Sequence, residues 1–197
     1  MEIPNIFLIG EDSQAGTYVL RIRVKEDTEL QFGRFKKGKL ISLLAGDYTY
    51  VGSALSEKGS TSLARRLVRH ATRSGDKPPH AIRDEMIKQF RECDLGPPDP
   101  LPKSGKKLFW NVDFMLDLEL AEIINVIAIR SPERLESTIA EFLEHNTDTQ
   151  IIEKSLGAND APRNTHVLRV NADDTWWASI ANDMQENFLS RSNDTGT

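Results

Sequence analysis

The chain has 197 residues, of which 39% are hydrophobic and 28% charged, and its formal net charge is −5 at pH 7. This length fits one main hydrophobic core, and the composition excludes a chain that is disordered throughout. No stretch approaches the roughly 20 apolar residues of a membrane helix, and no basic segment precedes the short apolar run near the start. We therefore expect a cytoplasmic protein with no membrane partner, and its single cysteine, Cys93, excludes an internal disulfide.

The first quarter of the chain predicts antiparallel strands. Residues 16–24 and 48–52 are rich in β-branched and aromatic types, as strands are. Between them, residues 30–44 contain Gly33 and Gly38 and predict a hairpin or a short pair of strands. Three or more antiparallel strands should therefore come first.

A helical pattern begins at Ser62, which is available as an N-cap. The apolar residues that follow recur at helical spacing: Leu63, Ala64, Leu67, Val68 and Ala71. A second helix is expected over residues 81–91. Residues 94–107 contain four prolines, which predict a surface loop that could be shortened with folding largely intact.

The second half predicts further strands at residues 108–116, 123–129 and 165–170. Ser131 and Pro132 are a typical N-cap and first helical residue, so a helix should run from there to about residue 143. A final helix is expected over residues 175–189.

These elements predict an α+β fold, in which a small, mainly antiparallel sheet from residues 16–52 and 108–129 packs against the helices after Ser62 and Ser131. The expected organisation is one domain over residues 1–170, with an insertion near residues 77–107. A C-terminal helix over residues 171–190 and a disordered tail over residues 191–197 would follow it.

Positive charge is concentrated in one region, although the whole chain is acidic. Residues 58–91 contain nine basic and three acidic residues, a local net charge of +6. At about 100° per residue, four side chains of the helix after Ser62 fall on one stripe: Arg66, Arg69, His70 and Arg73. This stripe could line a groove for phosphates, with Arg65, Arg69 and Arg73 as nucleic-acid contacts. A solvated basic helix face is the alternative.

Two tripeptides stand in successive predicted strands: Gly16-Thr17-Tyr18 and Tyr50-Val51-Gly52. Each alone is a common strand fragment, but the helix that follows them carries Arg66 and, four residues later, His70. This order resembles the GIY-YIG nuclease superfamily.

The resemblance is closer to one branch of that superfamily, called domain of unknown function 123, and it spans roughly residues 16–170. The segments that carry it are FGRF at 32–35, YTYVGSA at 48–54, RLVRH at 66–70, WNVD at 110–113, LGAND at 156–160 and THVL at 165–168. Two positions depart from the branch. Asn111 stands where the branch usually has histidine, and the segment at Asn159 lacks the usual cysteine, which leaves the roles of these positions open.

The resemblance implies metal-dependent hydrolysis of phosphodiester bonds in nucleic acid, with DNA favoured over RNA. By resemblance, Tyr18 orients or deprotonates the attacking water with Tyr50 beside it, and Arg66 stabilises the phosphate charge. His70 would position a tyrosine or phosphate oxygen.

The resemblance also implies one carboxylate that holds Mg²⁺ or Mn²⁺, and Glu136 is our candidate. An ordinary surface glutamate is the alternative, since Glu133 and Glu141 belong to the same predicted helix. Magnesium on one carboxylate is chemically reasonable, because it keeps waters and takes other ligands from a substrate phosphate. With a single cysteine, the sequence has no His/Cys cluster of the kind that binds zinc.

Two other functions stay open at this level. The acidic net charge and the altered late motifs favour a nucleic-acid-binding or regulatory module that does not cleave. The insertion and the adjacent Trp176 and Trp177 would suit a protein-interaction domain, although tryptophans in a terminal helix more often pack into the core.

Overall fold

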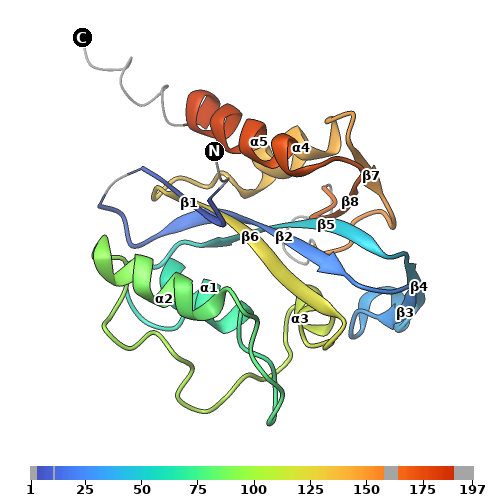
Figure 1. Ribbon diagram of the computed structural model, residues 1–197, viewed down its shortest axis with the longest axis horizontal. Helices are drawn as coiled ribbons and strands as arrows, with labels where there is room; N and C mark the ends of the chain where they lie inside the picture. Colours follow the sequence, from blue (N-terminus) through green and yellow to red (C-terminus); the bar gives the residue numbers. More distant parts are fainter. Residues whose placement is uncertain (1–3, 11, 158–163, 189–197) are drawn as a thin grey trace.

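The computed structural model describes residues 4–10, 12–157 and 164–188. It is an α+β fold around a six-stranded sheet, as the sequence predicts (Figure 1). The strands, in spatial order, are β1 (Ile6–Ile9), β6 (Ala121–Arg130), β2 (Gly16–Val24), β5 (Gly46–Ala54), β8 (Val167–Val170) and β7 (Thr149–Ile151). Only the β1–β6 pair is parallel, so the sheet is mainly antiparallel.

A second, two-stranded sheet consists of β3 (Thr28–Gln31) and β4 (Leu40–Leu43). A short 3-10 turn, η1 (Phe35–Lys37), joins them and ends at Gly38. Gly38 has a φ of 78°, a left-handed conformation that glycine adopts without a steric penalty. The hairpin predicted from Gly33 and Gly38 is therefore confirmed.

Helices cover both faces of the large sheet (Figure 1). One layer contains α1 (Leu63–His70), α2 (Arg83–Glu92) and α3 (Asn111–Leu116), and the other contains α4 (Glu136–Glu144) and α5 (Asp174–Phe188). Because side chains alternate along a strand, β2 and β5 direct residues to each layer in turn. Tyr18 and Tyr50 belong to the core beneath α1, whereas Val19 and Val51 belong to the core beneath α4 and α5.

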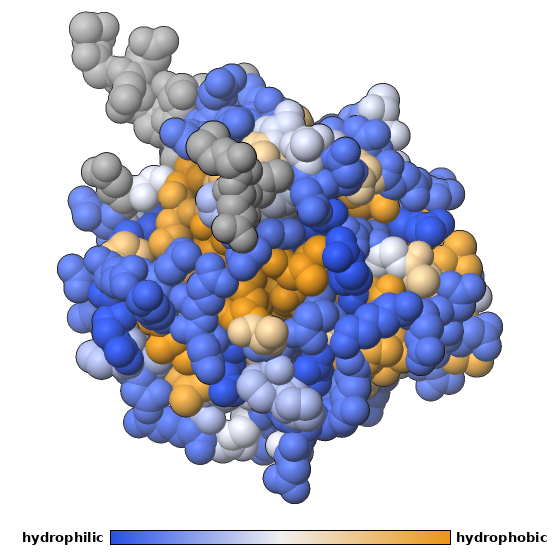
Figure 2. Space-filling model, viewed as in Figure 1, coloured by the Kyte–Doolittle hydropathy of each residue, from blue (hydrophilic) through white to orange (hydrophobic). Residues whose placement is uncertain are grey.

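The surface is mostly hydrophilic on the face that Figure 2 shows, and apolar residues show at the level of the sheet, between the two helical layers. Among the residues placed by the structure, no helix is long and apolar enough to cross a membrane. The C-terminal helix α5 packs its buried Trp177 onto the sheet. The predicted tail, residues 191–197, lies outside the described residues.

One predicted strand is wrong, because residues 111–116 of the segment 108–116 form the helix α3. Asp113 explains the difference. Its Oδ2 accepts the backbone N–H groups of Phe109 and Trp110, each at 2.9 Å, and so satisfies donors at the start of the helix. A carboxylate in the first turn also interacts favourably with the helix dipole.

The helix after Ser131 begins later than predicted. Ser131 Oγ accepts the backbone N–H of Glu133 at 3.2 Å within a turn, and α4 starts only at Glu136. The strands β1 and β7 were not predicted. They have four and three residues, too few to show a clear alternation of polar and apolar positions.

The proline-rich segment 94–107 contains no helix or strand, as predicted, but it is not a simple surface excursion. Leu95 is 1% exposed and Lys106 is 5% exposed, so both ends of the segment are packed. The backbone N–H of Gly96 also donates to Gln14 Oε1 at 2.6 Å. Shortening the whole segment would therefore remove part of the core, contrary to our expectation from the prolines.

Candidate functional site

The two tyrosine motifs fit together across the β2–β5 pair. Tyr18 on β2 lies directly opposite Gly52 on β5. A Cβ atom on Gly52 would lie 2.5 Å from the Tyr18 hydroxyl oxygen, closer than any real contact. The ring of Tyr18 therefore crosses Gly52, and the glycine of Tyr50-Val51-Gly52 makes room for the tyrosine of the first motif.

The tyrosines meet His70 beneath α1. The Tyr18 hydroxyl lies 2.8 Å from His70 Nε2, within hydrogen-bond distance. The ring of Tyr50 lies edge-on to His70, with 5.9 Å between centroids, and 6.2 Å from the ring of Tyr18. His70 reaches this position because it occupies the last turn of α1, on the buried side of the helix.

Burial controls the protonation of this cluster. Tyr18 and His70 are fully buried, and Tyr50 is 5% exposed. Burial raises the pKa of both tyrosines above the ordinary value and lowers the pKa of His70 to about 4. At neutral pH the phenols are therefore protonated and the imidazole is neutral.

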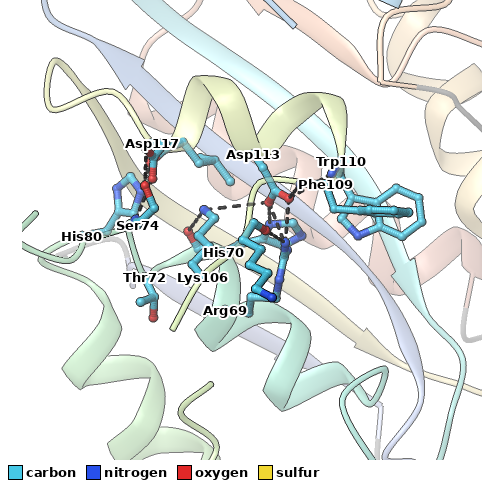
Figure 3. A network of polar contacts seen from close by, with 12 residues as sticks. Arg69, His70, Thr72, Ser74, His80, Lys106, Phe109, Trp110, Asp113 and Asp117 are labelled. Atoms are coloured by element: carbon cyan, nitrogen blue, oxygen red, sulfur yellow. Dashed lines mark hydrogen bonds and ion pairs between the residues drawn. The ribbon is translucent and has the colours of Figure 1, made fainter. Parts of the chain in front are cut away.

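Asp113 lies behind His70 at the centre of a polar network (Figure 3). Its Oδ1 is 3.5 Å from His70 Nδ1, at the outer limit of a hydrogen bond. A carboxylate on this side favours the tautomer with its proton on Nδ1. His70 Nε2 is then an acceptor, and the Tyr18 hydroxyl donates to it.

The Asp113 carboxylate has two further charged partners, Arg69 and Lys106. It accepts two hydrogen bonds from the Arg69 guanidinium, at 3.0 and 2.7 Å, and the Lys106 ammonium lies 3.8 Å away. Burial alone would raise the pKa of Asp113, but His70, Arg69 and Lys106 hold it well below its usual range. Burial also lowers the pKa of Lys106 to about 8.

Asp113 and Lys106 were not among the residues predicted for the site. Asp113 stands in WNVD, one of the segments that carry the resemblance, but we placed that segment in a strand. The sequence gives no signal for Lys106, which lies in the proline-rich segment and reaches the site only through the tertiary fold. Lys106 Nζ also donates to the backbone carbonyl of His70 at 3.4 Å.

Glu136 lies in the first turn of α4, near the edge of the large sheet. Strand β8 pairs with β5 over residues 47–50 of β5, and beyond that point the backbone N–H of Val51 donates to the carbonyl of His166 at 3.0 Å. Ser53, near the end of β5, contacts Glu136. Ser53 donates its hydroxyl proton to Glu136 Oε2, and His166 Nδ1 lies 3.1 Å from Glu136 Oε1. Glu133, which precedes α4, and Glu141 are exposed, whereas Glu136 is partly buried against Ser53 and His166.

The Glu136 carboxylate is ionised at neutral pH. Burial would raise its pKa, but His166, Ser53 and Arg66 together lower it below the ordinary value. The Glu136 side chain keeps 30% of its surface exposed, whereas His166 is 1% exposed as a residue. In the described part of the chain, no three His, Cys, Asp or Glu side chains are grouped as they would be to hold a metal by themselves.

A pocket of about 610 Å³ opens beside α1. Its lining includes five cationic side chains, Arg65, Arg66, Arg69, Lys103 and Lys107, and two aromatic ones, Phe109 and Trp110. The Arg66 guanidinium lies over the Trp110 ring, 5.0 Å from its centroid. The positive charge of Arg66 also favours the ionised forms of Tyr18 and Glu136.

The predicted basic stripe divides in the structure. Arg65, Arg66 and Arg69 line the pocket, but α1 ends at His70 and Arg73 lies beyond the helix. Arg73 is 4% exposed, donates to the backbone carbonyls of Leu118 and Pro78 at 3.2 and 2.7 Å, and pairs with Glu122 at 2.9 Å. With its guanidinium occupied inside the protein, Arg73 is a structural residue in this fold and does not line the predicted groove.

Of the two positions that depart from the branch, Asn111 is 7% exposed in the first turn of α3. Asn159 lies outside the described residues.

Comparison with known proteins gives one family. The family model described as "Domain of unknown function DUF123" matches residues 17–189. Neither the curated proteins nor the solved structures include a significant match. The matched region contains all eight predicted site residues and the network around Asp113, and because it covers most of the chain, this protein belongs to the DUF123 family.

Proposed function

We propose that this protein is a metal-dependent nuclease that hydrolyses phosphodiester bonds in nucleic acid, on a GIY-YIG-like fold. One observation carries the proposal. Tyr18, Tyr50 and His70 pack together, while Arg66 and Glu136 are close enough to influence the pKa of both tyrosines. The charges of Arg66, on α1, and Glu136, on α4, therefore act on the tyrosines of β2 and β5, which supports the proposal.

The residues at Glu136 fit a divalent cation. Glu136 is ionised and partly exposed, and neither ring nitrogen of His166 has a hydrogen-bond partner among the described residues. His166 Nδ1 and Glu136 Oε1 are 3.1 Å apart without the alignment of a hydrogen bond.

Glu136 would hold Mg²⁺ or Mn²⁺, with water and substrate phosphate as the remaining ligands, and the His166 imidazole would be a further ligand for Mn²⁺ rather than for Mg²⁺, which prefers oxygen. The metal would neutralise phosphate charge and lower the pKa of a bound water. Arg66 is placed to stabilise the charge that develops on the phosphate, since its planar donors can bind two oxygens at once.

Tyr18 is protonated at neutral pH, so it can accept a proton only if it passes its own proton on. His70 Nε2, neutral and 2.8 Å away, is the acceptor for that proton, and Asp113 stabilises the imidazolium that results. Tyr18 has no exposed surface, so this step also requires that substrate binding admit a water beside it.

A nucleic-acid-binding module that does not cleave is the second candidate. The complete burial of Tyr18 and its raised pKa favour it, because both oppose direct attack on a water. The cationic lining of the pocket supports both candidates equally.

A cleavage assay on single-stranded, duplex and branched substrates, with Mg²⁺ or Mn²⁺, tests the proposal. We expect Arg66→Ala to lower turnover by about 10²-fold or more, as loss of one preorganised charge-stabilising group does. Arg65→Ala is the matched control, because Arg65 lines the same pocket from the same helix. Glu136→Gln should reduce Mn²⁺ binding as well as turnover.

One outcome would contradict the nuclease proposal, and another would contradict the role of Arg66 in it. Binding without products under either metal would support the binding module instead. Equal, salt-sensitive losses of affinity in Arg66→Ala and Arg65→Ala would show that Arg66 is one phosphate contact among several.

A further inference from the structure

An exposed aromatic ring stands at the cationic pocket. Phe109 is 71% exposed, more than any other large hydrophobic residue among those the structure describes. Its ring meets the ring of Trp110 edge to face, with 4.9 Å between centroids. The Arg66 guanidinium lies over the Trp110 ring, 5.0 Å from its centroid. Phe109 is therefore fixed next to the site but leaves much of its own surface to solvent.

The charged side chains that line the pocket beside Phe109 all have one sign. Five cationic side chains line the pocket, and no Asp or Glu does. Arg69 is occupied by Asp113, but Arg65, Lys103 and Lys107 have no ion pair with any carboxylate that the structure places. In a protein of net charge −5, this is a local positive surface around an apolar ring. A ligand that matches it must combine a flat, uncharged face with negative charge on either side.

We propose that this pocket binds an unpaired nucleotide of a single strand, with its base stacked on Phe109 and its flanking phosphates on Arg65, Lys103 and Lys107. Bases stack on aromatic side chains regardless of sequence, since every base has a π face. In a duplex both faces of a base are already stacked, so a base that stacks on Phe109 must first leave the helix. The pocket should thus select single-stranded or splayed segments over intact duplex.

The size of the pocket is compatible with this ligand. Its volume of about 610 Å³ is within the range of pockets that enclose small organic ligands. The inference rests on the nucleic-acid part of the proposed function and not on hydrolysis, because a module that binds without cleaving would use the same contacts. It adds a substrate class to the site, namely nucleic acid with at least one unpaired base.

Binding of the full-length protein to fluorescent oligonucleotides, measured by anisotropy without divalent metal, tests this inference. The probes are a single-stranded DNA, the RNA of the same sequence and the matched DNA duplex. Phe109→Ala should weaken single-strand binding by about 5- to 150-fold, the effect of losing one base–aromatic stack, and leave duplex binding unchanged. Phe109→Trp should restore it.

Two further variants separate stacking from charge and from general contact area. Lys107→Ala should weaken binding to all probes and reduce the dependence of affinity on salt, whereas Phe109→Ala should leave the salt dependence unchanged. Leu101→Ala removes another exposed apolar side chain of the same pocket that cannot stack, and should have little effect.

The outcomes distinguish this inference from the proposed function. If the unmodified protein binds no probe, the stacking inference fails, whereas the proposed function fails only if the cleavage assay with Mg²⁺ or Mn²⁺ gives no product. If it binds single strands and duplex equally, or if Phe109→Ala weakens both to the same degree, only the stacking inference is overturned. Displacement of the single strand by an acidic peptide at comparable concentration would show that the pocket recognises charge alone, and would overturn it as well.

Discussion

The replacement of Asp113 by asparagine should destabilise the protein strongly. Among the described residues, this carboxylate is the only negative charge that forms an ion pair with the buried Lys106. The Asp113 and Lys106 side chains are both 0% exposed, and Arg69 is 20% exposed. Asparagine has nearly the same shape but no charge. Lys106 and Arg69 would then remain in place without compensation.

We expect a loss of about 3–5 kcal/mol in the free energy of unfolding, the usual cost of removing one partner from a buried ion pair. Two backbone donors add to the effect, since Asp113 Oδ2 accepts the N–H groups of Phe109 and Trp110 at the start of α3. An asparagine amide can replace one acceptor at most, and its NH₂ group would face the donors of Arg69.

Urea denaturation at pH 7 measures this loss, and Asp117→Asn is the matched control. Asp117 ends the same helix and pairs with Lys77, but Lys77 is 40% exposed and regains water when its partner is removed. The control should lose only about 1–2 kcal/mol. A loss below 1 kcal/mol for Asp113→Asn, or equal losses in the two variants, would refute the view that Asp113 compensates a buried charge.

Three other changes test particular contacts. Arg73→Ala should lower the free energy of unfolding, measured by urea denaturation, by about 3–5 kcal/mol, because it removes the buried partner of Glu122, whose pKa is about 2. Arg65→Ala is the control and should change it by no more than about 0.5 kcal/mol; an equally small change for Arg73→Ala would contradict the structural role of Arg73. Gly52→Ala should cost about 1–3 kcal/mol by overpacking against Tyr18, and much less in a Tyr18→Leu background; additive losses would argue against their contact. Folding lowers the pKa of His70 to about 4, so between roughly pH 6.5 and 4 the unfolded chain binds a proton at His70 that the folded chain does not. The free energy of unfolding should therefore decrease as the pH falls through this window. His70→Gln should flatten that decrease, with the part due to His80 remaining, and an unchanged slope would show that His70 is not buried neutral.

Much of the site was predictable because it depends on local patterns. Alternation along β2 and β5 places Tyr18 and Tyr50 on one face, and the helical period after Ser62 brings Arg66 and His70 together. These relations extend over a few residues and follow from backbone geometry alone. The α+β class was predictable for the same reason.

Other features depend on contacts between distant parts of the chain. The helical period alone assigned Arg73 to the stripe with Arg66, but α1 ends at His70, and the guanidinium of Arg73 turns inward to carbonyls more than forty residues away, at Leu118 and Ala121. Likewise, prolines correctly predict that residues 94–107 form no helix or strand. They carry no information on whether Leu95 and Lys106 are buried.

The sequence by itself therefore determined which strands and which helix carry Tyr18, Tyr50, Arg66 and His70. The reason is that the repeat of a strand or a helix fixes the direction in which each of its side chains points. Only the tertiary structure decided which charges surround them. Asp113 and Lys106 reach His70 from 43 and 36 residues away in the sequence. A charged side chain can be buried only where an opposite charge compensates it, and the pattern of residues next to it in the sequence does not show where that partner is.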